Sequence, residues 1–131
     1  MGVLFPLKQL TRLFKAMSDP TRLRLVNLLH AQSLCVGDLQ EVLGLSQSLV
    51  SRQLAILRAA NLVRTQRQGA RVRYSLSRAP FLNYPLGKFL SEMVPFFPEL
   101  EVDAEKLAEL KGVSILKPDS EDSSGGPLES V

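Results

Sequence analysis

The chain has 131 residues and a mass of 14.5 kDa, of which 45% are hydrophobic and 22% charged. This is the size of one ordinary domain, and it supplies enough apolar residues for a core. No run reaches the ~18 consecutive apolar residues that a membrane span needs, and the first ten residues lack the pattern of a signal peptide. A single cysteine excludes an internal disulfide. We therefore expect a protein of the reducing cytoplasm that does not associate with membranes.

The net charge of +3 conceals two parts of opposite sign. Residues 1–79 hold twelve Lys or Arg and three Asp or Glu, whereas residues 80–131 hold four and ten. Ten of the twelve basic residues in the first part are arginine. An arginine-rich segment favours a polyanionic partner, but net charge alone is equally compatible with a solvated surface. The motifs must decide between these two interpretations.

The N-terminal part predicts two helices separated by a short break. Apolar residues recur three and four positions apart over residues 6–17, which predicts an amphipathic first helix. Asp19 is a suitable N-cap, and Pro20 a suitable first residue, for a second helix that extends to about Ala31. Leucine and valine cover more than half of the girth of this second helix, so we expect it at the centre of the core.

A second pair of helices follows an extended piece at residues 34–36. The first of them, over residues 38–43, ends at Gly44, which suits a left-handed cap. Ser46 is a suitable N-cap for the next helix, over residues 47–60. The predicted buried stripe of that helix consists of Val50, Leu54 and Leu57. Two helices joined by such a short turn indicate a helix-turn-helix.

The next two segments have the pattern of β-strands. Residues 62–66 form the first run, and residues 71–76 alternate polar and apolar side chains with a period of two. Gly69 lies in the predicted turn between them. Arginines at the edge and tip make this a basic β-hairpin. A helix-turn-helix followed at once by a basic hairpin predicts a winged helix, in a fold that is otherwise mostly helical.

The C-terminal part predicts two more helices and a tail. Residues 82–97 carry more large apolar side chains than a peripheral helix of a small domain needs, which is typical of an interface. Residues 103–111 predict a last short helix. We therefore expect a DNA-binding and dimerisation domain over residues 1–98, a short helical segment over residues 99–117, and a disordered acidic tail over residues 118–131.

The predicted DNA contacts fall at the start of the second helix of the pair and on the hairpin. Polar side chains in the first turns of a recognition helix can hydrogen-bond to base edges or phosphates in the major groove. Arginines of a wing suit the phosphate backbone or the minor groove. The predicted set is Gln47, Ser48, Ser51, Arg52, Gln53, Arg67, Arg71 and Arg73. The partner that these residues predict is double-stranded DNA.

Four of these segments resemble the ArsR/SmtB-type bacterial repressors. They read FKAMSDPTRL at residues 14–23, LCVGDL at residues 34–39, SQSLVSRQLAILR at residues 46–58 and GARVRY at residues 69–74. They occur in the order typical of the family, and the resemblance covers about residues 5–80. It implies a winged helix-turn-helix that represses an operator until an inducer releases it.

The resemblance also implies a homodimer whose interface is built by the first and fifth helices. The high apolar density of residues 81–97 agrees with that expectation, although a helix folded back on its own domain is the alternative. The residues predicted at this interface are Leu7, Leu10, Phe14, Leu86, Phe89, Leu90 and Met93.

The ligands with which many family members sense metals are missing from this sequence. The arsenite type carries a Cys-x-Cys motif, but here Cys35 is followed by Gly37 where the second cysteine would stand. The zinc type places ligands on the fifth helix, yet residues 81–97 hold no histidine and only Glu92 as a carboxylate. Since zinc needs three or four such ligands, we predict neither a metal nor another cofactor.

Three other interpretations compete with a metal-independent repressor. A winged-helix protein-interaction module would use the acidic residues 99–122 for docking, but it would not require so many arginines on the wing. A thiol-based redox regulator would use Cys35, which we otherwise interpret as a remnant of the family motif. An enzyme would need paired carboxylates, a nucleophile with its base or a glycine-rich phosphate loop, and none of these is evident.

Overall fold

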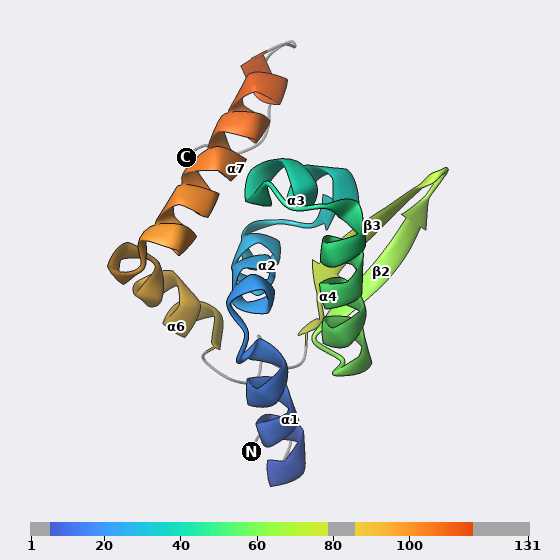
Figure 1. Ribbon diagram of the computed structural model, residues 1–131, viewed down its shortest axis with the longest axis vertical. Coiled ribbons are helices and arrows are strands. Elements are labelled where there is room, and N and C mark those ends of the chain that lie inside the picture. Colours follow the sequence, from blue (N-terminus) through green and yellow to red (C-terminus); the bar gives the residue numbers. More distant parts are fainter. Residues whose placement is uncertain (1–5, 79–85, 117–131) are drawn as a thin grey trace.

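The computed structural model describes residues 6–78 and 86–116, and Figure 1 shows their arrangement. The first two elements are α1 (Leu7–Met17) and α2 (Pro20–Ala31). Pro20 occupies the first turn of α2, and the Asp19 carboxylate accepts a hydrogen bond from the backbone N–H of Arg22 at 3.1 Å. The predicted cap of α2 is confirmed.

The helix-turn-helix consists of α3 (Val36–Leu43) and α4 (Gln47–Ala59), preceded by the short strand β1 (Leu34–Cys35). Gly44 ends α3 with a φ of 67°, a left-handed conformation that glycine adopts without steric cost. The Ser46 hydroxyl accepts a hydrogen bond from the backbone N–H of Leu49 at 3.2 Å and so caps α4. The predicted stripe of α4 is fully buried, comprising Val50, Leu54 and Leu57.

The sheet has three antiparallel strands in the order β1-β3-β2, where β2 is Val63–Gln68 and β3 is Arg71–Leu76. The predicted hairpin is confirmed, but β2 extends two residues further than predicted. The turn therefore contains Gly69 and Ala70 alone, with Gly69 at a φ of 64°. The sequence pattern predicted an extended piece at residues 34–36 but not its pairing with β3, which places Leu34 opposite Tyr74.

The C-terminal part differs from the prediction in its helix boundaries. Instead of one helix up to residue 97, there is α6 (Leu86–Met93) followed by a 3-10 turn, η1 (Val94–Phe96). The next helix, α7, is Pro98–Leu116, much longer than the predicted residues 103–111. Proline has no N–H and favours the first turn of a helix, so Pro95 and Pro98 stop one helix and start the next. The predicted start of the fifth helix and the predicted disordered tail lie outside the described residues.

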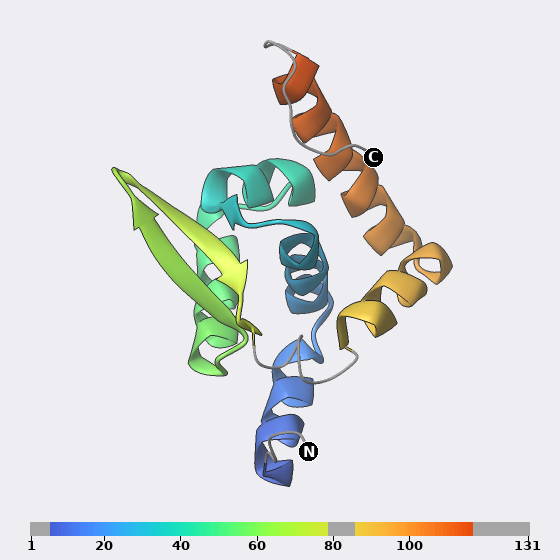
Figure 2. The same cartoon turned by 180° about the vertical axis from the view of Figure 1, so that it is seen from behind.

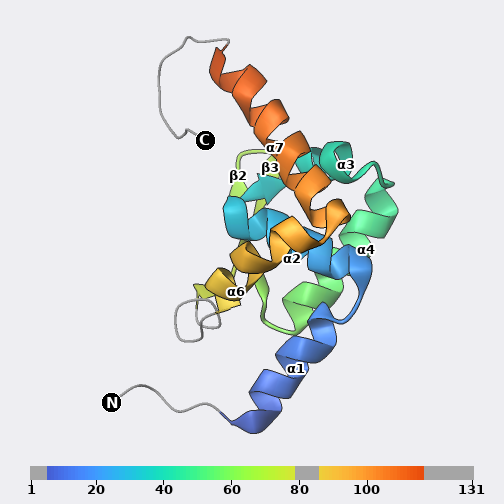
Figure 3. The ribbon, with the colours of Figure 1, turned by 90° about the vertical axis from the view of Figure 1, so that its left-hand side faces the viewer.

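The core is centred on α2, which packs against α1, α4, β3 and α7. Leu25, Val26 and Leu28 in α2 are at most 1% exposed. In Figure 1 and, from behind, in Figure 2, α4 and the hairpin lie on one side of α2, and α6 and α7 lie on the other. Figure 3 shows α1 extending away from this body. No helix in the described part of the chain is both long and apolar enough to cross a membrane.

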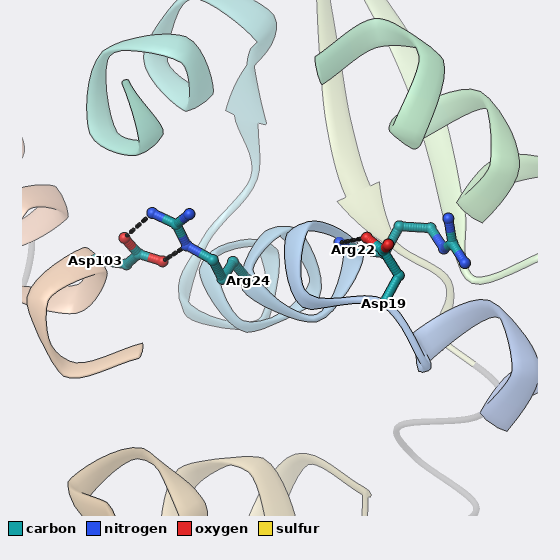
Figure 4. Close-up of polar contacts among 4 residues, drawn as sticks. All are labelled: Asp19, Arg22, Arg24 and Asp103. Atoms are coloured by element: carbon teal, nitrogen blue, oxygen red, sulfur yellow. Dashed lines mark hydrogen bonds and ion pairs between the residues drawn. The ribbon is translucent and has the colours of Figure 1, made fainter. Parts of the chain in front are cut away.

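A partly buried ion pair attaches α7 to α2, since the side chain of Arg24 is 26% exposed. Asp103 is 1% exposed, and its two carboxylate oxygens accept hydrogen bonds from Nε and Nη2 of Arg24 at 2.8 and 2.9 Å (Figure 4). The hydrogen bond to Asp103 is the largest of the effects that raise the pKa of Arg24 above its ordinary value. A second ion pair, between Lys111 and Asp38 at 3.6 Å, joins α7 to α3. Leu107 adds apolar contact in the same interface.

Candidate nucleic-acid interface

The recognition helix α4 presents one exposed stripe opposite its buried one. Residues three and four positions apart share a helix face, and Ser48, Arg52, Ala55 and Ala59 are all exposed along such a face. Gln47, in the first turn, is also exposed. Of the residues predicted to read bases, Gln47, Ser48 and Arg52 are therefore accessible. Ser51 is partly buried and lies at the edge of the stripe that faces the hairpin.

The hairpin, which forms the wing, places its arginines on both faces. Residues on neighbouring strands that stand opposite each other point to the same face, and successive residues alternate. Arg67 stands opposite Val72, whereas Arg71 stands opposite Gln68, so the two exposed arginines leave the wing on opposite faces. A wing with cations on both faces and at its tip can contact phosphates on either side of a groove.

An open cleft of about 420 Å³ lies between α4 and β3. Its polar lining residues are Ser51, Arg58 and Tyr74, and its apolar ones are Leu54, Ala55 and Ala59. Arg58 is exposed and lines the cleft, although the sequence pattern did not place it in the site. Its position after the first two turns of the helix excluded it from the predicted set. The cleft makes α4 and the wing two walls of one continuous surface.

The segments that form α4, β2 and β3 carry no negative charge. The sequence has no Asp or Glu between Glu41 and Glu92, an interval that contains the whole of α4, β2 and β3. The exposed arginines of the interval are Arg52, Arg58, Arg64, Arg67, Arg71 and Arg78. Guanidinium groups stay charged at neutral pH and match the geometry of phosphate. The arrangement is suited to a polyanion that spans both walls.

Arg73 and Gln53, two of the residues predicted to contact DNA, are hydrogen-bonded to distant parts of the chain. Nη1 of Arg73 donates to the carbonyl oxygen of Ser33 at 2.8 Å, and its Nε donates to Oε1 of Gln68 at 3.1 Å. Oε1 of Gln53 accepts a hydrogen bond from Nη1 of Arg22 at 2.8 Å. The contacts of Arg73 join β3 to Ser33 and to the end of β2, and the contact of Gln53 holds the middle of α4. The sequence pattern did not predict them because the bonds to Ser33 and Arg22 span 40 and 31 residues.

The residues predicted at the dimer interface divide into three groups. Leu7, Phe14 and Phe89 are 75%, 53% and 52% exposed. Leu10 and Met93 are partly buried. Leu86 and Leu90 belong to the core of the single chain, so they support the fold of α6 from within. The predicted interface did not include Phe96, yet this residue is 78% exposed in the turn after α6.

The cysteine and histidine of the chain lie apart from the arginine surface. Cys35 is 7% exposed in β1, opposite Arg73. His30 lies in the last turn of α2 and packs against α6, where a Cβ atom at Gly87 would stand 2.7 Å from the imidazole Cε1. The Ser91 hydroxyl lies 3.4 Å from Nε2 of His30. Among the described residues, no three His, Cys, Asp or Glu side chains are grouped as a metal site.

Taken together, α3, α4 and the hairpin define a winged helix-turn-helix. Residues 19–65 match the model of the family described as bacterial regulatory protein, arsR family. The chain is 45% identical over 76 residues to a transcriptional repressor SmtB homolog of Synechocystis sp., and the match covers 58% of each chain. It is 35% identical over 100 residues to the HTH-type transcriptional regulator CmtR of Mycobacterium bovis, covering 76% of this chain and 80% of that one.

A solved structure agrees with these sequence matches. Reduced HlyU from Vibrio cholerae has a TM-score of 0.58 and 31% identity, and the match covers 70% of this chain and 90% of that one. The chain belongs to the ArsR family of bacterial regulatory proteins, a family of transcriptional regulators rather than enzymes. The match to the Synechocystis repressor spans little more than half the length of either protein.

Proposed function

We propose that this protein is a homodimeric, sequence-specific DNA-binding repressor. The observation that carries the proposal is the set of exposed arginines on α4 and the wing, in an interval of sequence without a single acidic residue. The exposed side chains Gln47, Ser48 and Arg52 read base edges in the major groove. Arg67 and Arg71 hold the phosphate backbone or the minor groove, and they set affinity rather than sequence preference.

The exposed apolar side chains of α1 and α6 support the homodimer. Leu7, Phe14 and Phe89 are each more than half exposed, and burying such side chains against a second copy removes apolar surface from water. A two-fold dimer places two recognition helices in successive major grooves, about 34 Å apart. The operator is then an inverted repeat with half-sites one helical turn apart. The name of the Synechocystis relative, a transcriptional repressor, supports repression as the outcome.

Selection of genomic DNA fragments by the purified protein tests the proposal. We expect a single inverted-repeat motif to emerge, and sedimentation of the protein at micromolar concentration to give about twice the mass of 14.5 kDa. Lys106→Ala is the matched control, because it removes one exposed positive charge from α7, on the other side of α2. A protein that enriches no sequence, or a monomer that binds its selected site tightly, would contradict the proposal.

A further inference from the structure

Arg22 makes hydrogen bonds in three places: at the cap of α2, at the end of α1 and in the recognition helix α4. Its backbone N–H donates to the Asp19 carboxylate at 3.1 Å, within the cap of α2. Its Nε donates to the carbonyl oxygen of Ala16 at 2.6 Å, in the last turn of α1. Its Nη1 donates to Oε1 of Gln53 at 2.8 Å, in the middle of α4. One guanidinium therefore joins the end of α1 to the recognition helix.

The contact with α1 is favourable for reasons of helix chemistry. The last four carbonyl groups of an α-helix have no partner within the helix, and Ala16 carries one of them. A cation at this end also complements the negative end of the helix dipole. Arg22 is partly buried, so water competes less for the bond than at an exposed site. This chemistry fixes the guanidinium at the end of α1.

The contact with α4 is on the side of the helix away from the wing. Gln53 lies one position after Arg52 and about 100° further around the helix, whereas the edge at Ser51 faces the wing cleft. Holding Gln53 therefore adds a polar contact to the buried stripe in constraining the rotation of α4 about its own axis. That rotation decides where the exposed stripe of Ser48 and Arg52 points. A small change in it moves every base-reading side chain together.

We propose that Arg22 is a positioning residue for DNA recognition, which sets the orientation of α4 relative to α1 through Gln53. The inference rests on the proposed function, in which α1 helps to build the dimer and α4 reads bases. In the dimer, Arg22 links the helix at the interface to the helix in the groove, once in each protomer. It thereby fixes the orientation of both recognition helices relative to the interface. Arg22 itself does not touch DNA.

Two substitutions at Gln53 separate positioning from direct contact with DNA. Gln53→Met keeps the length of the side chain but removes the acceptor, so we expect a loss of about tenfold in affinity for the selected operator. Gln53→Glu keeps an acceptor for Arg22, so its ratio of operator affinity to scrambled-duplex affinity should stay above that of Gln53→Met, even though the added negative charge lowers both affinities. If the amide of Gln53 instead contacts a base directly, both variants lose that contact and the ratio falls equally in the two. Equal ratios in the two variants would overturn the proposal.

A double-mutant cycle provides the second test. Arg22→Gln should lower operator affinity about tenfold while changing affinity for a scrambled duplex by less than twofold. The double variant Arg22→Gln with Gln53→Met should lose no more operator affinity than Arg22→Gln alone. Arg22→Lys, a single ammonium that cannot hold both acceptors, should give an intermediate loss. Arg12→Ala, an exposed arginine of α1, is the control and should keep wild-type affinity.

The outcomes distinguish this proposal from the proposed function. If the wild type selects no operator, the proposed function fails before Arg22 is tested. If the wild type selects an operator but Arg22→Gln and Gln53→Met add independently, or lower affinity for operator and scrambled duplexes equally, the positioning role is wrong. Circular dichroism melting of each variant shows whether it is folded. If Arg22→Gln does not fold, the comparison of DNA binding by Gln53→Met and Gln53→Glu still tests the positioning role.

Discussion

The two sides of α2 are held by two arginines that lie two residues apart and use different chemistry. Side chains two positions apart leave a helix about 200° apart, and Figure 4 shows Arg22 and Arg24 extending in opposite directions. Arg24 meets the buried carboxylate of Asp103 in α7, whereas Arg22 meets the neutral amide of Gln53 in α4. An ion pair thus joins α2 to α7, whereas hydrogen bonds from Arg22 to neutral acceptors join α2 to α1 and α4.

This difference follows from what each side faces. A carboxylate on α4 would hold Arg22 more strongly, but it would also place negative charge beside bound phosphates. The side of α7 has no such restriction, and exposed glutamates such as Glu101, Glu105 and Glu109 lie on it. Among the described residues, both ion pairs involve α7, so we call the α7 side of α2 the supporting side. The side that we propose to bind DNA keeps its positive charge unneutralised.

The largest effect on stability is expected from breaking the pair on the supporting side. Asp103→Ala leaves the guanidinium of Arg24, which is 26% exposed, without its partner, and losing hydrogen bonds to a charged group costs about 2 kcal/mol. Urea denaturation should show this loss in the free energy of unfolding. Glu105→Ala, an exposed change in the same helix, should alter it by less than about 0.5 kcal/mol. A loss below about 1 kcal/mol for Asp103→Ala would remove the contrast between the two sides.

The next effect concerns base recognition by α4. Arg52→Ala removes an exposed side chain from the stripe that we propose to read bases, and a good base contact discriminates by about 1–3 kcal/mol. Operator affinity should fall by that amount, and base preference should relax at particular positions while others are retained. Competition binding with single-base variants of the operator measures both. An Arg52→Ala protein with unchanged preference at every position would show that α4 does not read the sequence.

A smaller and different effect is expected on the wing. Arg71→Ala should weaken binding to operator and scrambled duplexes alike, because an interaction with phosphate carries no sequence information. The slope of log affinity against log salt should become shallower by about 0.9 for each phosphate that the variant no longer neutralises. Salt titrations on both duplexes measure it. If the wing variant loses sequence preference and the α4 variant does not, the two roles are assigned the wrong way round.

The smallest effect is expected at the cysteine. Cys35 is buried in β1, and serine is close to it in size, so Cys35→Ser should retain operator affinity within about twofold of the wild type. A gel-shift titration under reducing conditions measures this. The same titration after treatment with an oxidant tests the thiol interpretation. If oxidant releases the wild type from DNA and leaves the variant bound, Cys35 is a sensor and not a remnant of the family motif.

The elements that could be predicted from the sequence are those whose signals are local. The caps at Asp19 and Ser46, the left-handed Gly44 and the alternation of residues 71–76 each depend on a few neighbouring residues, and all are confirmed. The buried stripe of α4 follows equally from helical spacing. These local signals, in their order along the chain, were sufficient for the winged helix and for the accessible residues of α4.

The features that could not be predicted depend on residues far apart in the chain. The bond from Arg73 to Ser33 spans 40 residues, and the pair of Arg24 with Asp103 spans 79. From the neighbouring sequence alone, Arg73, Arg24 and Asp103 would each be interpreted as a solvated charged side chain. The length of α7 was underestimated for the same reason, since Leu107 and Asp103 are buried by contacts with other helices, and α7 packs against α2 and α3.

The central claim is that the α4 and wing side of α2 contacts DNA and the α7 side does not. Covalent modification of arginines by a dicarbonyl reagent, read by mass spectrometry with and without the selected operator, tests it residue by residue. We expect the operator to slow modification of Arg52, Arg67 and Arg71 at least fivefold, and to leave the rate at Arg24 unchanged. Protection at Arg24 with none at Arg52, Arg67 or Arg71 would contradict the account.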